Sequence, residues 1–192
     1  MKVKDIVSNE FTSDDRPVLI MVADEGRFGR LGDVKACWCP DGVRPTVAKQ
    51  QVRQYTYAYA AVAPSLGKMT CLILPFSNTK MMNLFLKQVS IEFSEYLIIM
   101  QLDRAGWHRS KSLKIPENIR LIFQPSYSPE LMPVEHLWEY IRENYFYNKI
   151  FNSMVQVIDT LEKALLDLSK KTELLQSMTY FPHLRVSFLN AT

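Results

Sequence analysis

The stretch YLIIMQLD at residues 96–103 begins with five consecutive apolar side chains and ends on Asp103. A short apolar run that stops at a polar residue is typical of a buried β-strand. The stretch VLIMVAD at residues 18–24 has the same form and ends on Asp24. Both segments therefore predict covered strands, each followed directly by a carboxylate.

A third carboxylate, Glu135, stands in the segment MPVEHLWEYI at residues 132–141. Proline is favoured at the first position of a helix, so Pro133 predicts that a helix begins here and carries Glu135 in its first turn. Two strand-end aspartates and a helix-borne glutamate are the parts needed to hold divalent metal ions. Taken singly, each acid also has a structural explanation, because turns favour aspartate and helix N-termini favour glutamate.

The remaining chain reads as an antiparallel meander followed by alternating helix and strand. We expect strands at 18–23, around 35–39, at 54–63, 68–74, 96–102 and 119–123, and helices at 79–94, 107–113, 133–148 and from Ser153 onward. This order predicts an α/β fold with a mixed sheet, antiparallel first and then parallel, flanked by helices. Residues 1–16 are expected to be a tail or linker remnant, 17–170 one catalytic domain, and 171–192 a tail that can pack on that domain.

Composition excludes several classes of protein. The length of 192 residues and the hydrophobic fraction of 47% suit one globular domain. No apolar run approaches the roughly 20 residues that cross a bilayer, and the N-terminus lacks a signal-peptide core, so we expect a cytoplasmic protein. The 3 cysteines lack C-x-x-C spacing and are interpreted as ordinary thiols.

Basic residues gather directly after the first two candidate acids. Residues 27–53 contain six basic and two acidic side chains, and residues 104–120 contain five basic and one acidic. Basic side chains beside an acidic metal site are the arrangement expected if a polyanion such as a nucleic acid binds there. Charge alone favours the alternative, in which these are two solvated faces.

Three segments resemble known sequence blocks: ADEGRFG at 23–29, LDRAGWH at 102–108 and QPSYSPELMPVEHLW at 124–138. Together they resemble the catalytic domain of the bacterial insertion-sequence branch of mariner-like transposases, in the DDE superfamily of RNase H-like nucleases. The resemblance extends from about residue 17 to about residue 170. A junction resolvase or a ribonuclease is disfavoured by the third block.

The resemblance implies an RNase H-like fold, with a mixed five-stranded sheet flanked by helices, and a catalytic, metal-binding triad of Asp24, Asp103 and Glu135. It implies two Mg²⁺ or Mn²⁺ ions, cleavage at transposon ends and transfer of the freed 3′-hydroxyl to target DNA. The implied partners are DNA and a second copy of the chain, with no membrane, in a nucleoid-associated cytoplasmic location.

Several other side chains are expected near the site. We name eight candidates for contact with DNA: Arg27, Arg30, Arg104, His108, Arg109, Lys111, Tyr127 and His136. For His108 and His136, a structural hydrogen bond is the alternative role. Glu25 is expected to point away from Asp24, because successive side chains of a strand face opposite sides. Trp138 lies on the apolar stripe of its helix and is expected in the core.

Two residues depart from the resembling family. Arg104 stands where that family has asparagine, so a cation can pair with Asp103 or contact phosphate. Met132 also replaces an asparagine, a strong N-cap, and the helix carrying Glu135 is expected to lose about 1 kcal/mol. Sixteen polar N-terminal residues are too few for a DNA-recognition domain, so we expect no end-specific binding. The alternative function is an impaired remnant that binds nucleic acid non-specifically.

Overall fold

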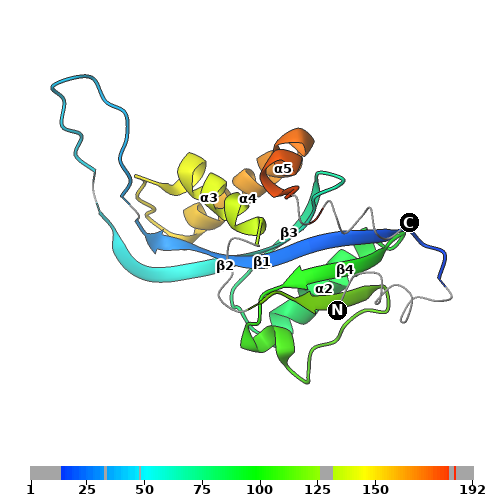
Figure 1. Ribbon diagram of the computed structural model, residues 1–192. Coiled ribbons are helices and arrows are strands. Elements are labelled where there is room, and N and C mark those ends of the chain that lie inside the picture. Colours follow the sequence, from blue (N-terminus) through cyan, green and yellow to red (C-terminus); the bar gives the residue numbers. More distant parts are fainter. Residues whose placement is uncertain (1–13, 33, 48, 126–131, 182–183, 185–192) are drawn as a thin grey trace.

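The computed structural model describes residues 14–32, 34–47, 49–125, 132–181 and 184. One sheet forms its centre, with strand order β3-β2-β1-β4-β5 (Figure 1). The strands are β1 (Val18–Leu31), β2 (Gln51–Ala63), β3 (Lys68–Leu74), β4 (Leu97–Leu102) and β5 (Ile119–Phe123). The first three are antiparallel, whereas β4 lies parallel to β1 and β5 lies parallel to β4. The predicted mixed five-stranded sheet is confirmed.

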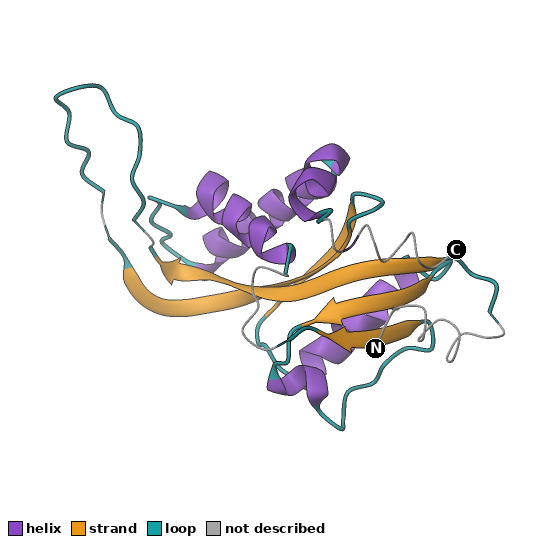
Figure 2. Cartoon of the chain, viewed as in Figure 1, coloured by secondary structure: helices purple, strands orange, loops and turns teal. Residues whose placement is uncertain are grey.

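Helices cover both faces of this sheet (Figure 2). They are α2 (Thr79–Glu92), the 3-10 turn η1 (Gly106–Arg109), α3 (Val134–Ile141), the π-helical turn η3 (Arg142–Phe146), α4 (Met154–Ser169) and α5 (Thr172–Thr179). Among the described residues, no helix is long and apolar enough to cross a membrane.

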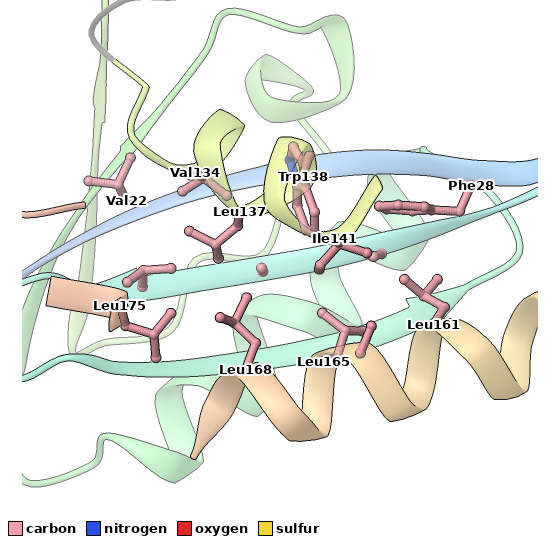
Figure 3. Close-up of a cluster of buried hydrophobic side chains, with 14 of the residues drawn as sticks. Val22, Phe28, Val134, Leu137, Trp138, Ile141, Leu161, Leu165, Leu168 and Leu175 are labelled. Atoms are coloured by element: carbon pink, nitrogen blue, oxygen red, sulfur yellow. The ribbon is translucent and has the colours of Figure 1, made fainter. Parts of the chain in front are cut away.

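The strict alternation of β1 divides the core into two layers. Leu19 and Met21 face α2, whereas Ile20 and Val22 face α3, α4 and α5. Figure 3 shows the second layer, in which the side chains of α3 and α4 meet on the sheet. Its members include Val22, Phe28, Val134, Leu137, Trp138, Ile141, Leu161, Leu165, Leu168 and Leu175. Sheet residues of even number in β1, including Asp24, therefore point toward α3.

The first strand is longer than its apolar run predicts. β1 does not end at residue 23, because β2 continues to pair with it from Val22 to Leu31. Asp24 lies opposite Ala60 in mid-strand, so the prediction of a strand-end aspartate is wrong for this residue. Residues 27–30, which lie beyond the strand expected at 18–23, also belong to β1. Ladder hydrogen bonds with β2 hold these residues extended, and Phe28 among them packs in the core.

The prediction of a strand around residues 35–39 is wrong. The described residues of the connection between β1 and β2 contain no strand, and Figure 1 shows this connection extending away from the sheet and the helices. Cys37 and Cys39 are exposed free thiols, and Trp38 between them is fully exposed. A segment forms a β-strand only where a neighbouring strand supplies hydrogen-bond partners. No such neighbour is present among the described residues of this connection.

The helices near the C-terminus differ from expectation in length. The helix predicted at 133–148 ends at Ile141 and continues as the η3 turn, and the one predicted at 107–113 is reduced to η1. Ser153 caps α4 as predicted, since its hydroxyl accepts the N–H of Gln156. Within the segment 171–192, α5 was not foreseen, and its Leu175 is fully buried against the core.

Candidate active site

Asp24 lies where the middle of β1 passes beneath α3. Its Oδ2 accepts a hydrogen bond of 2.9 Å from the indole Nε1 of Trp138, a side chain that is only 1% exposed. Burial raises the pKa of Asp24, an effect that the hydrogen bond from Trp138 partly opposes. Trp138 is a core residue as expected, but its polar contact with Asp24 was not foreseen.

Gly26 allows this contact. A Cβ atom at Gly26 would stand 2.6 Å from Cδ2 of Trp138, a separation that real Cβ contacts essentially never show. The missing side chain therefore lets the indole approach β1 closely and reach Asp24.

Asp103 follows β4, as its sequence predicts. Its Oδ1 accepts two hydrogen bonds, one of 2.9 Å from the backbone N–H of Ala105 and one of 2.7 Å from Nδ1 of His108. The hydrogen bond from His108 lowers the pKa of Asp103 below its usual value, against a smaller opposing effect of burial. The side chain is 43% exposed, so a ligand can reach this carboxylate.

His108 connects Asp103 to Glu25 of β1. The Nε2 of His108 lies 2.8 Å from Oε1 of Glu25, and the two side chains are 0% and 6% exposed. Burial alone would lower the pKa of His108, but hydrogen bonds to Asp103 and Glu25 raise it to about 9. Burial raises the pKa of Glu25 despite this contact. Glu25 leaves β1 on the face opposite Asp24, as expected, yet it contacts the second acid through the imidazole.

Glu135 occupies the first turn of α3. Burial raises its pKa, and the charges of Asp24 and Asp103 raise it further, while Arg142 lowers it. Asp103 likewise raises the pKa of Asp24. The three acids, far apart in sequence, are thus close enough to repel one another.

The helix that delivers Glu135 begins without a side-chain cap, because its N-cap is Pro133 and not Met132 as expected. The Met132 side chain is instead buried in the core, where it is 4% exposed. Its backbone carbonyl accepts the N–H of Glu135 at 3.1 Å, which fixes the first turn through the main chain.

The donor chemistry of the three acids fits a hard divalent cation such as Mg²⁺ or Mn²⁺, which prefers carboxylate oxygens. Repulsion among the carboxylates is what a bound cation would offset. Among the described residues, however, no three His, Cys, Asp or Glu side chains are already grouped closely enough to hold a metal ion. The three carboxylates lie near one another, but their oxygens do not surround a common metal position.

The predicted cations divide by their contacts. Arg27, Arg109 and Lys111 are exposed, and Arg27 stacks on the ring of Tyr55 at 5.0 Å. His136 is also open, with its side chain 53% exposed.

Other predicted cations are held by the protein itself. Arg30 donates to the Phe151 carbonyl and to Gln54, and Arg104 donates its Nε to the Gln124 carbonyl at 3.0 Å. This nitrogen of Arg104 is directed to the backbone, while the residue as a whole is exposed.

His108 was predicted to contact DNA, and the structure contradicts this. Both ring nitrogens face carboxylate oxygens, and the side chain is fully buried. Its alternative role, a structural hydrogen bond, agrees with the geometry. Tyr127, another predicted contact, lies outside the described residues.

Comparison with known proteins assigns the chain to a family. Residues 19–158 match the family of DDE superfamily endonucleases. The chain belongs to this family. The membership and the class of enzyme expected from the sequence are thereby confirmed. Over 106 residues the chain is 38% identical to an uncharacterized protein, y4pE/y4sA, of Sinorhizobium fredii, covering 54% of this chain and 78% of that protein.

The fold of this DDE endonuclease domain is similar to solved structures of Mos1 transposase. The Mos1 strand transfer complex matches with a TM-score of 0.63 at 14% identity, covering 98% of this chain and 58% of the other. The Mos1 mariner paired end complex with Mn matches with a TM-score of 0.61 at 13% identity, covering 96% and 60%. The predicted RNase H-like fold is confirmed, and the chain spans about three fifths of those transposase chains.

Proposed function

We propose that this chain is the catalytic domain of a transposase, which cleaves DNA strands and transfers them to a target by metal-dependent phosphoryl transfer. One observation carries the proposal. Trp138, three residues after Glu135 on α3, donates a hydrogen bond to Asp24 of β1, and Asp103 directly follows β4, which pairs in parallel with β1, in a chain that belongs to the DDE endonucleases.

Asp24, Asp103 and Glu135 would hold two Mg²⁺ or Mn²⁺ ions. When bound, such ions activate the attacking oxygen and stabilise the leaving oxygen in phosphoryl transfer. The protein supplies ligands on rigid elements, since Asp24 is fixed by Trp138 and Asp103 by Ala105 and His108. Solved Mos1 paired end complexes include one with Mn and one with Mg, which supports this choice of ion.

DNA is the proposed substrate, as duplex ends and target. Exposed Arg27, Arg109 and Lys111 supply positive charge on segments that follow Asp24 and Asp103. Beside Arg27, a groove of about 630 Å³ is lined by Arg53, Tyr55, Tyr57 and Phe76, together with Gln54, Pro75, Ser77, Asn78 and Met154. Aromatic rings with arginines suit stacking on bases and contact with phosphate. We further propose that two copies of the chain act together at the nucleoid.

Nicking of supercoiled DNA tests the proposed chemistry. The parent protein should nick it with Mg²⁺ or Mn²⁺ and not in EDTA, and Asp103→Ala should abolish nicking while the circular dichroism spectrum stays unchanged. Equal nicking by Asp103→Ala and the parent would remove Asp103 from the mechanism.

A second candidate function is a remnant that binds nucleic acid without cleaving it. This candidate is favoured because no three His, Cys, Asp or Glu side chains among the described residues are grouped closely enough to hold a metal ion. It predicts DNA binding that is indifferent to Mn²⁺ and no nicking under any condition. In both cases affinity should fall steeply as salt rises, because cations contact phosphates. Affinity that is insensitive to salt would contradict both candidates.

A further inference from the structure

The orientation of Asp103 depends on residues outside the three acids. Both hydrogen bonds to its side chain among the described residues end on Oδ1, from the backbone of Ala105 and from His108. A carboxylate with one oxygen held in this way keeps the other available to an external ligand. The side chain is 43% exposed, so that ligand can come from solvent.

His108 is in turn held by Glu25. Oε1 of Glu25 lies 2.8 Å from Nε2 of His108, and Oε2 accepts the indole N–H of Trp107 at 3.3 Å. Both oxygens of one carboxylate on β1 therefore bind consecutive residues of the η1 turn. The contact chain runs from a rigid central strand through a buried imidazole to the edge of the site.

We propose that Glu25 and His108 are positioning residues, which hold the Asp103 carboxylate in the orientation that binds metal. This inference rests on the proposed function of Asp103. Groups that hydrogen-bond to a metal ligand fix its orientation, and their removal typically weakens metal binding about 10- to 100-fold.

A purely structural tie between η1 and β1 would not require this chemistry. Burying an ionisable pair is costly, and well-packed apolar side chains of similar size often stabilise a fold equally well. Here the buried pair ends on an exposed carboxylate, Asp103, which a structural tie would not need. Both imidazole nitrogens face carboxylate oxygens, so the ring is locked at its two ends and cannot rotate without losing a contact.

Direct measurement of Mn²⁺ binding tests the proposal without relying on catalysis. Free Mn²⁺ is followed by electron paramagnetic resonance in the parent, Asp103→Asn, His108→Ala, Glu25→Ala and Glu25→Gln. We expect His108→Ala and Glu25→Ala to bind Mn²⁺ about 10- to 100-fold more weakly. Glu25→Gln should retain most of the affinity, because its amide can donate to Nε2 while Nδ1 still donates to Asp103.

Asn118→Ala is the matched control for lost stability. Asn118 is 5% exposed, and its amide donates to the carbonyl oxygens of Phe93 and Tyr96. It precedes β5, whose parallel pairing with β4 puts Asn118 at the opposite end of the strands from Asp103. This variant should unfold at a lower temperature yet bind Mn²⁺ like the parent.

The outcomes distinguish failure of the positioning role of Glu25 and His108 from failure of the metal site at Asp103. If Asp103→Asn binds weakly while Glu25→Ala and His108→Ala bind like the parent, the positioning role is overturned and the metal site stands. If Asp103→Asn itself binds like the parent, the metal site and the positioning role both fail. Should His108→Ala not fold, the difference between Glu25→Ala and Glu25→Gln decides the matter.

Discussion

At the scale of single residues, the indole N–H of Trp138 is the contact that fixes Asp24. Trp138→Phe keeps an aromatic ring in the core but leaves Oδ2 of Asp24 without its 2.9 Å donor. Loss of a partner for a buried carboxylate should lower the free energy of unfolding by about 1–3 kcal/mol. Urea denaturation of the metal-free protein measures this change.

Trp38→Phe is the control for the same substitution at a fully exposed site. It should leave the free energy of unfolding within about 0.5 kcal/mol of the parent. Equal stabilities of both variants and the parent would show that the contact between Trp138 and Asp24 is energetically silent.

The three cysteines should differ in reactivity. Burial raises the pKa of the Cys71 thiol to about 11, whereas Cys37 and Cys39 are exposed. Only the thiolate attacks a disulfide reagent, so at pH 8 roughly one Cys71 thiol in a thousand is reactive. Titration with Ellman's reagent should show two fast thiols and one slow thiol, and Cys71→Ser should remove the slow phase. A single rate for all three would contradict the burial of Cys71.

At the scale of elements, α5 is an integral part of the fold. Leu175 of α5 is fully buried, so Leu175→Ala should lower the free energy of unfolding by about 2–5 kcal/mol. Leu166→Ala, the same change on α4 at a side chain that is 52% exposed, should cost far less. Chemical denaturation compares the two. Similar small losses would mean that α5 does not contribute to the cooperative unit.

Helices that are marked by a signal in their own sequence could be predicted. Segments whose structure depends on hydrogen bonding to a distant strand could not. The starts of α2 at residue 79 and of α4 after Ser153 were readable because an N-cap, here Asn78 and Ser153, is a local signal. The extension of β1 through Arg27 depends on β2, which lies far along the chain. The eight residues of α5 contain too few turns for a clear periodicity, and α5 is held by packing on α3 and α4 and by the hydrogen bond from Gln176 to the Ser65 carbonyl.

For the site, sequence indicated the three acids but not the residues that hold them. Asp24, Asp103 and Glu135 stand in blocks that resemble a known family. Nothing local predicts that Glu25 and His108, 83 positions apart, share a hydrogen bond. A tertiary contact of this kind arises when β4 pairs with β1 and brings η1 over the central strand.

At the scale of the whole molecule, buried charge on the sheet makes stability depend on pH. The folded pKa of His108 is about 9, above its ordinary 6.5, so its stabilisation is complete below about pH 6.5 and disappears as pH rises through 9. The raised pKa values of Asp24, Glu25 and Glu135 also make stability fall as pH rises, but they take effect from the ordinary values of 3.8 and 4.5 upward, so His108 sets the interval from pH 6.5 to 9. In EDTA, the melting temperature should therefore fall between pH 6.5 and 9.

A variant at His108 tests whether this imidazole causes the fall in melting temperature. A shift of this extent corresponds to a contribution on the order of 3 kcal/mol from His108. His108→Gln has no titrating group at this position, so its melting temperature should change less across the same range. Differential scanning calorimetry of both proteins at several pH values measures the difference. Parallel curves for His108→Gln and the parent would show that the imidazole between Glu25 and Asp103 is not the source of the pH dependence.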